Sequence, residues 1–371
     1  MTDQSNLLEK KYRAEADGLA SAPAGYSGRV TWECPSNIAL IKYWGKKAIQ
    51  KPINPSLSFT LQKSVTSLSV DFLVHKADHE LTLEFLLEDR PHPLFAERLM
   101  KYLQHVSQFM PFLKSMHLKM QSRSSFPHSA GIASSASSFG AIALALCSME
   151  QKLFGNLRSE NDFFRKASFL ARLGSGSASR SVYGGCALWG STPEFEGSTD
   201  EAAIPVTDAI NPLYANYRDS ILVVSSGLKS VSSTTGHKLM EEHPFAAARV
   251  IQANHNMARI KQSLIVGDQH AFINLIEHEA LTLHGLMLSS DPGFILIQPD
   301  TLEIIRKVRY YRKETGTPVG FTLDAGANVH LLYPATTEKD IHGFIEENLK
   351  RHCENGLVIH DQVGSGPVKI L

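Results

Sequence analysis

Strand patterns and helix patterns are mixed along this chain without a regular strand–helix–strand alternation, and this order constrains the fold most. A doubly wound parallel sheet requires that alternation, so we predict the α+β class instead. Apolar alternation and short apolar runs predict strands from Gly28 to about Val70, and 3.6-residue spacing predicts helices farther along. The later predictions are strands at 81–87, 116–121, 220–225 and 294–297 and helices at 94–108, 160–173, 244–267, 269–288 and 301–315.

The order of the predicted elements restarts beyond Pro212, which suggests two domains. A length of 371 residues fits that division, because a domain typically contains about 150 residues. We therefore expect an N-terminal extension at 1–27, a first domain at 28–215 and a second domain at 216–371.

The charges of the chain cancel, because Lys and Arg total 37 and Asp and Glu also total 37. Proteins that bind nucleic acid or anionic membranes depend on a surplus of basic residues. We therefore expect no nucleic-acid partner, and an anionic ligand would need a local cluster of cations. The most membrane-like stretch, 130–149, is interrupted by serines, so no membrane-spanning segment is predicted.

The cysteines and histidines suggest neither a disulfide framework nor a zinc site. Four cysteines lie far apart without a CxxC pair, and the first residues lack the apolar core of a signal peptide. We therefore predict a reducing, cytoplasmic location. An HExxH motif beginning at His278 would need histidine at position 282, which is Thr282, so we expect His278 and His284 to be surface or supporting residues.

Glycine, alanine and serine dominate the segment 124–147, which leads into an Ala/Leu-rich helix that ends at about 153. Small residues let a ligand approach the backbone, and amides at a helix N-terminus attract phosphate. Ser134, Ser135 and Ser137 would add hydroxyls. A helix packed tightly in a core is an equally good interpretation, and neither a Walker nor a Rossmann pattern is present.

A second loop, ARLGSGSASRSVYGG at 171–185, combines four glycines with Arg180, Ser175 and Ser177. One guanidinium and two hydroxyls would suit a phosphate or a carboxylate. A flexible surface linker has the same composition, so this loop alone does not decide between the two.

Two further segments place charges beside apolar strands. In NIALIKYWGKK, at 37–47, continued extension would put Lys42, Trp44 and Lys46 on one face and Tyr43 on the other. Desolvated lysines would repel each other unless anions lay between them, whereas a solvated basic edge is the simpler interpretation. In FTLDAGANVHLLYP, Asp324 ends a strand, where it could accept a substrate hydroxyl or complete an Asx turn.

Taken together and in this order, NIALIKYWGKK, AGIASSAS, GSGSASRSVYGG and FTLDAGANVHLLY resemble the mevalonate diphosphate decarboxylase family of the GHMP kinase superfamily. The resemblance implies a ribosomal-protein-like N-terminal domain that binds ATP, a ferredoxin-like C-terminal domain and a cleft between them. It also implies ATP-dependent decarboxylation of mevalonate 5-diphosphate to isopentenyl diphosphate, in the mevalonate pathway of isoprenoid biosynthesis, with Mg²⁺ and by a homodimer.

The resemblance also implies roles for individual residues. Asp324 would orient or deprotonate the 3-hydroxyl, with Lys42 beside it to keep it ionised, and Arg180 would hold the substrate carboxylate and diphosphate region. The other implied substrate contacts are Tyr43, Lys46, Ser175, Ser177 and Ser232 or Ser233. The implied nucleotide contacts are Ser122, Gly131, Ala133, Ser134, Ser135 and Ser137, with Ser135 also near the magnesium ion.

The chain departs from the family pattern at Pro55, Thr234, His237 and Ala327. Thr234 stands where many bacterial members have an arginine, so one diphosphate contact is in question. Three alternatives therefore stay open. They are a decarboxylase acting on mevalonate 5-phosphate, a mevalonate 3-kinase, and a metabolite-binding scaffold without activity.

Overall fold

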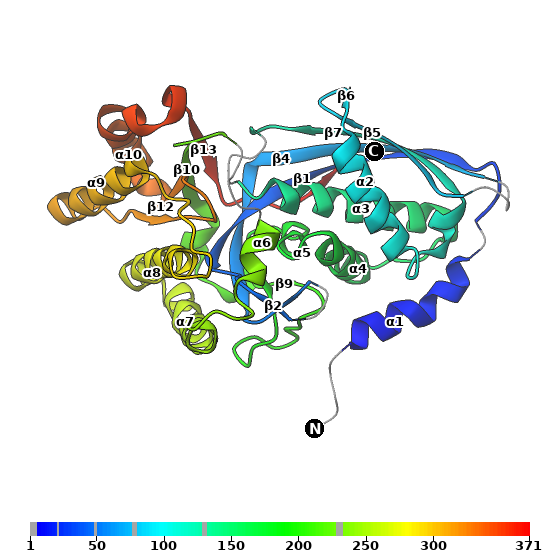
Figure 1. The fold of residues 1–371 in the computed structure, drawn as a ribbon, viewed down its shortest axis with the longest axis horizontal. Helices are drawn as coiled ribbons and strands as arrows, with labels where there is room; N and C mark the ends of the chain where they lie inside the picture. The colour runs from blue at the N-terminus through cyan, green and yellow to red at the C-terminus, as the bar shows by residue number, and fades with distance from the viewer. Residues whose placement is uncertain (1–5, 21, 48–49, 76–79, 128–131, 228–232) are drawn as a thin grey trace.

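The first layer of the protein is an eight-stranded sheet (Figure 1). The computed structural model describes residues 6–20, 22–47, 50–75, 80–127, 132–227 and 233–371. The strands run in the order β14-β1-β4-β7-β5-β6, and β8 joins β4 to β9. Their bounds are β1 Ser27–Ile41, β4 Ser56–Val74, β5 Thr82–Leu87, β6 Arg90–Pro91, β7 Met116–Ser124, β8 Cys186–Trp189, β9 Ile204–Pro205 and β14 Val368–Lys369.

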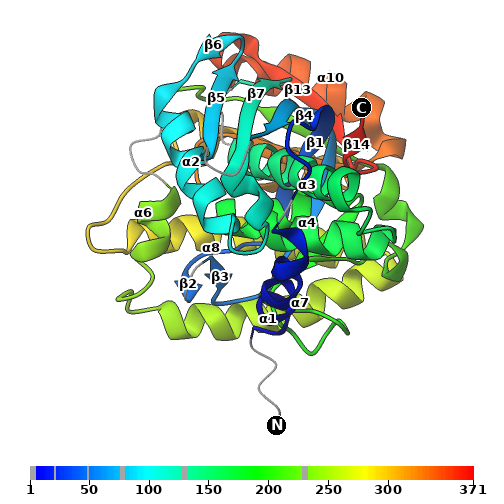
Figure 2. The same ribbon diagram turned by 90° about the vertical axis from the view of Figure 1, so that its right-hand side faces the viewer.

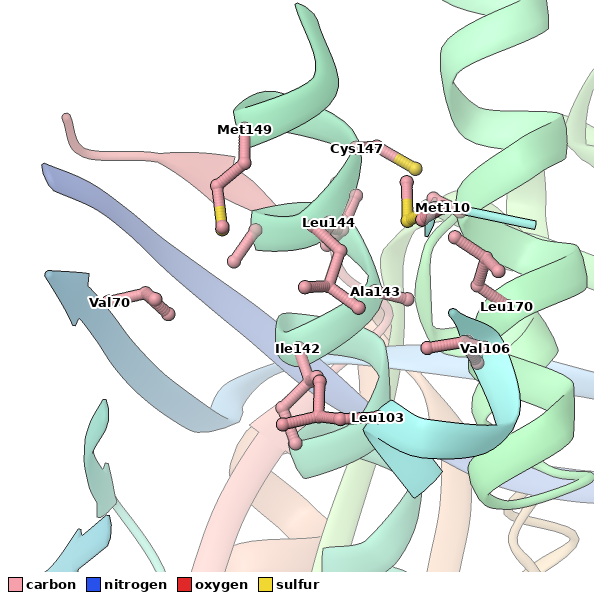
Figure 3. Packing of buried hydrophobic residues seen from close by; sticks show 14 of the residues in the cluster. Val70, Leu103, Val106, Met110, Ile142, Ala143, Leu144, Cys147, Met149 and Leu170 are labelled. Atoms are coloured by element: carbon pink, nitrogen blue, oxygen red, sulfur yellow. The ribbon is translucent and has the colours of Figure 1, made fainter. Parts of the chain in front are cut away.

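A buried helix, α3 (Ser134–Phe154), packs on β1 and β4 beside α2 (Pro93–Val106) and α4 (Glu160–Gly174). Fourteen of its residues are buried, so it has no polar face of any width. Figure 3 shows Leu144 and its neighbours between Val70 of the sheet and Leu170 of α4. The Ala/Leu-rich pattern therefore belongs to a core helix whose N-terminus still reaches the edge of the layer.

The second layer is a four-stranded sheet in the order β11-β12-β10-β13. Its strands are β10 Tyr217–Leu222, β11 Gly320–Thr322, β12 Val329–Pro334 and β13 Val358–Gln362. Helices α7 (Ala246–Val266) and α8 (Gln269–Leu288) pack against each other (Figure 2), and α8 also packs on β11. The remaining helices are α1 Leu7–Glu15, α5 Ala178–Ser181, α6 Ser233–Lys238, α9 Pro299–Thr315 and α10 Glu338–Phe344.

The long strands β1 and β4 connect the two layers. Their register shifts between Pro35 and Asn37, where proline has no amide to donate to the ladder. Beyond this irregularity Ile38, Leu40 and Ile41 are buried in a cluster shared with β10, α7 and α8. The end of β1 is therefore held between the layers, and Lys42 follows it directly.

The α+β class is confirmed, and the predicted helices at 94–108, 160–173, 244–267, 269–288 and 301–315 correspond to α2, α4, α7, α8 and α9. The strand predicted at 294–297 is wrong. Phe294 and Leu296 pair with no strand of the described residues and instead pack against the hydrophobic cluster that contains Trp44. Their apolar pattern therefore reflects a loop that covers this cluster. The strand predicted at 220–225 ends at Leu222.

The predicted boundary near residue 215 precedes β10, the first strand of the second sheet, whereas β14 returns to pair with β1 of the first sheet. Within the described ranges, no helix is both long enough and apolar enough to cross a bilayer.

Candidate active site

A cleft of about 320 Å³ lies where β1 ends, beside the N-terminus of α3 and the loop between α4 and α5. Helix α6 and the turn after β11 also line it, together with Arg98 of α2 and Leu283 of α8. The cleft brings together residues from distant parts of the sequence, such as Lys42 and Asp324, which are 282 positions apart. The predicted site residues that line it are Lys42, Tyr43, Lys46, Ala133, Ser135, Ser175, Ser177, Arg180 and Asp324.

Lys42 and Asp324 form an ion pair in this cleft. The Lys42 Nζ donates a hydrogen bond to Asp324 Oδ1 over 2.9 Å. The lysine side chain is 2% exposed and that of the aspartate 25%, so solvent reaches the carboxylate but not the amine. Burial lowers the pKa of Lys42, and the Asp324 carboxylate opposes that change. A solvated basic edge is therefore the wrong interpretation of Lys42.

The turn after β1 directs more side chains into the cleft than an extended strand could. The strand ends at Ile41, and Gly45 has a φ of +92°, so the predicted alternation of faces does not persist. Tyr43 lines the cleft together with Lys42, and Trp44 packs closely on Gly236 of α6. The expectation that Tyr43 lies on the opposite face is wrong because the chain turns before Lys46.

Arg180 presents a donor without a partner. Its Nε donates to Ser58 Oγ over 2.9 Å and its Nη2 to Asn37 Oδ1 over 3.3 Å, which leaves the buried Nη1 unpaired among the described residues. Burial lowers the pKa of Arg180 to about 10, so it remains a cation at neutral pH. The buried Tyr43 hydroxyl also has no partner among them. Such groups in a native protein call for a ligand or water.

Cations predominate in the cleft although the whole chain is neutral. Lys42, Lys46, Arg98 and Arg180 line it, and Asp324 is the carboxylate among its described lining residues. Burial, and secondarily Arg98, lowers the pKa of Lys46. The local concentration of positive charge expected from the neutral composition is therefore present, and it suits an anionic ligand.

Three serine hydroxyls connect the N-terminal end of α3 with the loop before α5. Ser135 Oγ lies 3.2 Å from Ser175 Oγ, which lies 3.3 Å from Ser177 Oγ. Ala133, at the N-cap of α3, has a φ of +46° and provides no capping side chain. The three hydroxyls therefore lie together in the cleft lining, beside the N-terminus of α3. The loop at 171–185 is no flexible linker, because α5 is buried throughout.

Some predicted nucleotide contacts do not line the cleft. Ser122 is buried within β7, and Ser137 Oγ bonds to Thr66 Oγ1 over 2.7 Å and to the Ser134 carbonyl. Ser134 begins α3 and also lies outside the lining. Gly131 and Ser232 fall outside the described residues, and Ser233 is placed only as the first residue of α6.

Several supporting residues were missed by the sequence reasoning. Arg249 and Glu279 form a buried ion pair that hydrogen-bonds to the backbone of Lys42. His284, by contrast, was expected to be a surface or supporting residue; it is buried, and its Nε2 bonds to the Asp324 carbonyl over 3.1 Å, which agrees with the supporting role. Polar residues at these helix positions resemble ordinary surface residues, and only the packing of α7 and α8 on β1 buries them. The described part of the chain has no group of three or more His, Cys, Asp or Glu that could hold a metal.

His237 supports the turn that carries Lys46. Its Nδ1 accepts a hydrogen bond from the Gly45 amide over 2.9 Å, and its ring lies 4.3 Å from that of Tyr43 and 4.7 Å from that of Trp44. Burial, with a smaller contribution from Lys46, lowers the pKa of His237 to about 3. The imidazole is therefore neutral in the folded protein throughout the physiological range.

This shift predicts a stability difference between the wild type and His237→Met. An unfolded histidine binds its proton near pH 6.5 and the folded one only near pH 3, so lowering the pH between these values favours unfolding. The contribution is about 1.4 kcal/mol per pH unit, or roughly 2 kcal/mol between pH 6.5 and pH 5. Urea unfolding at pH 7.5 and pH 5 should show a smaller loss for His237→Met than for the wild type. Equal losses would contradict a neutral, buried His237.

Known proteins match both halves of the chain. Two family models, a diphosphomevalonate decarboxylase-like N-terminal domain and a mevalonate 5-diphosphate decarboxylase C-terminal domain, match residues 34–202 and 220–369. Diphosphomevalonate decarboxylase of Eremothecium gossypii is 31% identical over 330 residues, which are 84% of this chain and 79% of that protein. The human diphosphomevalonate decarboxylase is 30% identical over 81% of this chain and 75% of its own.

Two solved structures match nearly the whole chain. Mevalonate diphosphate decarboxylase from Staphylococcus aureus gives a TM-score of 0.79 at 28% identity, over 93% of this chain and 99% of that chain. MDDEF in complex with MVAPP, AMPPCP and magnesium gives a TM-score of 0.77 at 28% identity, with the same coverage. The two family models together span every described residue that lines the cleft.

Proposed function

The chain belongs to the mevalonate diphosphate decarboxylase family, and from that membership we propose how its cleft works. It converts mevalonate 5-diphosphate and ATP into isopentenyl diphosphate, ADP, phosphate and carbon dioxide. The observation that carries the proposal is the contact of Lys42 Nζ with Asp324 Oδ1, in a cleft where Arg180 presents an unpaired donor. This arrangement combines a group that accepts a hydroxyl proton with groups that bind anions.

Asp324 acts on the 3-hydroxyl of the substrate. A tertiary hydroxyl is a poor leaving group, so it is first phosphorylated, and the carboxylate accepts its proton or orients it toward the phosphoryl group. The Lys42 amine opposes protonation of its partner. Loss of the new phosphate then leaves positive character at C3, and the bond to the carboxylate breaks to give carbon dioxide.

Arg180, Tyr43 and Lys46 hold the anionic ends of the substrate. The Nη1 of Arg180 and the hydroxyl of Tyr43 are buried donors without partners among the described residues, and Lys46 adds a nearby cation. Ser175 and Ser177 lie beside them. Buried charge-assisted hydrogen bonds of this kind fix orientation as well as affinity.

The nucleotide lies along the N-terminus of α3. Hydroxyls and helix amides suit its phosphates, and Ser135 is the hydroxyl there that lines the cleft. Mg²⁺, when bound with the nucleotide, offsets the charge of the triphosphate. Ser135 would be its protein contact, which fits the preference of this ion for oxygen ligands and substrate phosphates.

A comparison of two substrates tests the proposal. We expect kcat/KM for mevalonate 5-diphosphate to exceed that for mevalonate 5-phosphate at least tenfold, because each charge-assisted hydrogen bond to the second phosphate contributes about 1.5–3 kcal/mol. Released carbon dioxide and ADP are the readouts. Faster turnover of the monophosphate would overturn the substrate assignment. ADP without carbon dioxide would indicate a 3-kinase, and neither product would indicate a binding scaffold.

The protein works in the cytoplasm as a homodimer in this proposal. Cys34, Cys147, Cys186 and Cys353 are buried free thiols, which suits a reducing compartment. Light scattering at micromolar concentration tests the dimer.

A further inference from the structure

The peptide groups of Lys42 are held by side chains from two helices of the second layer. The Lys42 amide donates to Glu279 Oε2 of α8 over 2.8 Å. Its carbonyl accepts from Arg249 Nη2 of α7 over 3.0 Å and from Asn54 Nδ2 over 3.0 Å. Strand β1 ends one residue earlier, so these bonds replace the sheet ladder at this position.

Arg249 and Glu279 form a buried ion pair with two hydrogen bonds. The guanidinium makes two hydrogen bonds to the carboxylate, of 2.6 Å and 2.8 Å, and Asn256 Nδ2 donates a third of 2.7 Å. The two charged side chains are 1% and 0% exposed. Burial alone would raise the pKa of Glu279, but the hydrogen bonds and charge of Arg249 outweigh it and the pKa is lowered. Glu279 is therefore ionised.

Stability alone does not account for this pair. Buried ion pairs are commonly no better than apolar side chains of similar volume, because both charges lose their hydration. Here Arg249 and Glu279 each form a hydrogen bond with the backbone of Lys42. The amine of that lysine donates to Asp324. Neither Arg249 nor Glu279 lines the cleft. Their hydrogen bonds to Lys42 are made to its backbone, and the charge of Glu279 also raises the pKa of the Lys42 amine.

We propose that Arg249 and Glu279 are positioning residues, which fix the backbone of Lys42 so that its amine is held against Asp324. The inference rests on the proposed function for its kinetic consequence only. A displacement of about 1 Å of a reacting group can lower a rate by about 10²-fold. The pair therefore affects turnover without touching substrate or nucleotide.

The test replaces both charges together, as Arg249→Met/Glu279→Leu, so that no unpaired charge remains buried and the protein stays folded. We expect kcat to fall at least tenfold, with KM for both substrates within about threefold of the wild type. The matched control is Lys166→Met/Glu150→Leu, which removes another fully buried Lys/Arg–Glu pair, 2.7 Å long and outside the cleft lining. The control should keep the wild-type kcat.

A second measurement does not need turnover. Trinitrobenzenesulfonate labels accessible amines, and mass spectrometry of the Lys42 peptide should show labelling at least tenfold faster in Arg249→Met/Glu279→Leu than in the wild type or the control. Unchanged labelling in a folded variant would overturn the inference, as would an unchanged kcat or an equal loss in the control. A wild type without turnover would refute the proposed function, and labelling would still decide whether the pair positions Lys42.

Discussion

Replacing Asp324 with alanine is expected to abolish decarboxylation while ATP binding stays within a few-fold of the wild type. The carboxylate is the acceptor that faces the cleft beside Lys42, and removing such a group typically lowers a rate by about 10²–10⁴-fold. Burial lowers the pKa of Lys42 and Asp324 opposes that change, so removing the carboxylate lowers this pKa further and makes the buried charge easier to lose, and the variant should fold. Carbon dioxide release measures activity, and calorimetry measures nucleotide affinity.

A surface aspartate provides the control for this experiment. Asp71 pairs with Arg29 on β1, with side chains 37% and 55% exposed, and it lies outside the cleft lining. Asp71→Ala should therefore retain wild-type activity. Wild-type turnover by Asp324→Ala would refute the role of this carboxylate. Parallel loss of turnover and of ATP affinity would show instead that Asp324 maintains the shape of the cleft.

Local signals predicted most of the helices. Helix α8 begins and ends where its sequence indicates, because the Asp268 side chain accepts from the Ala271 amide over 3.0 Å and caps the first turn. Helix α9 likewise ends before Gly316, which adopts a φ of +70°. Such boundaries depend on a few neighbouring residues, so the sequence alone reveals them.

The location of the catalytic loops could be predicted, but their mutual geometry could not. Lys42, Arg180 and Asp324 were each singled out in a short motif, and the cleft brings all three together. The segment alone favoured a solvated Lys42, and that was wrong because its burial depends on how α7 and α8 cover the end of β1. Long-range packing of this kind leaves no periodic signal in the segment it affects.

The residues that support Lys42 could not be predicted from their neighbouring sequence, for a related reason. Glu279 lies 237 positions after Lys42, and charged residues on a helix are usually solvated. The strand predicted at 294–297 failed similarly, because an apolar run does not reveal whether a neighbouring strand is present to pair with it. Both cases required the tertiary arrangement.

Arg180→Lys is expected to lower kcat/KM for mevalonate 5-diphosphate strongly, although the substitution keeps the positive charge. The guanidinium keeps two donors on Ser58 and Asn37 while its Nη1 stays available to a ligand, and one ammonium cannot reproduce that planar fork. Losing one or two charge-assisted hydrogen bonds costs about 3 kcal/mol, so kcat/KM for this substrate should fall about 10²-fold. The ATP affinity should remain within a few-fold.

The pH profile of this variant adds a second readout. Burial lowers the pKa of Arg180 to about 10, and the same burial would lower that of a lysine, whose ordinary pKa is already below that of arginine. The variant should therefore lose activity at a lower alkaline pH than the wild type. Arg312→Lys is the control, because Arg312 bonds to Glu277 and the Val319 carbonyl outside the cleft lining, so its replacement should leave kcat/KM unchanged. Equal kcat/KM in Arg180→Lys and the wild type would show that charge alone, rather than the fork, holds the substrate.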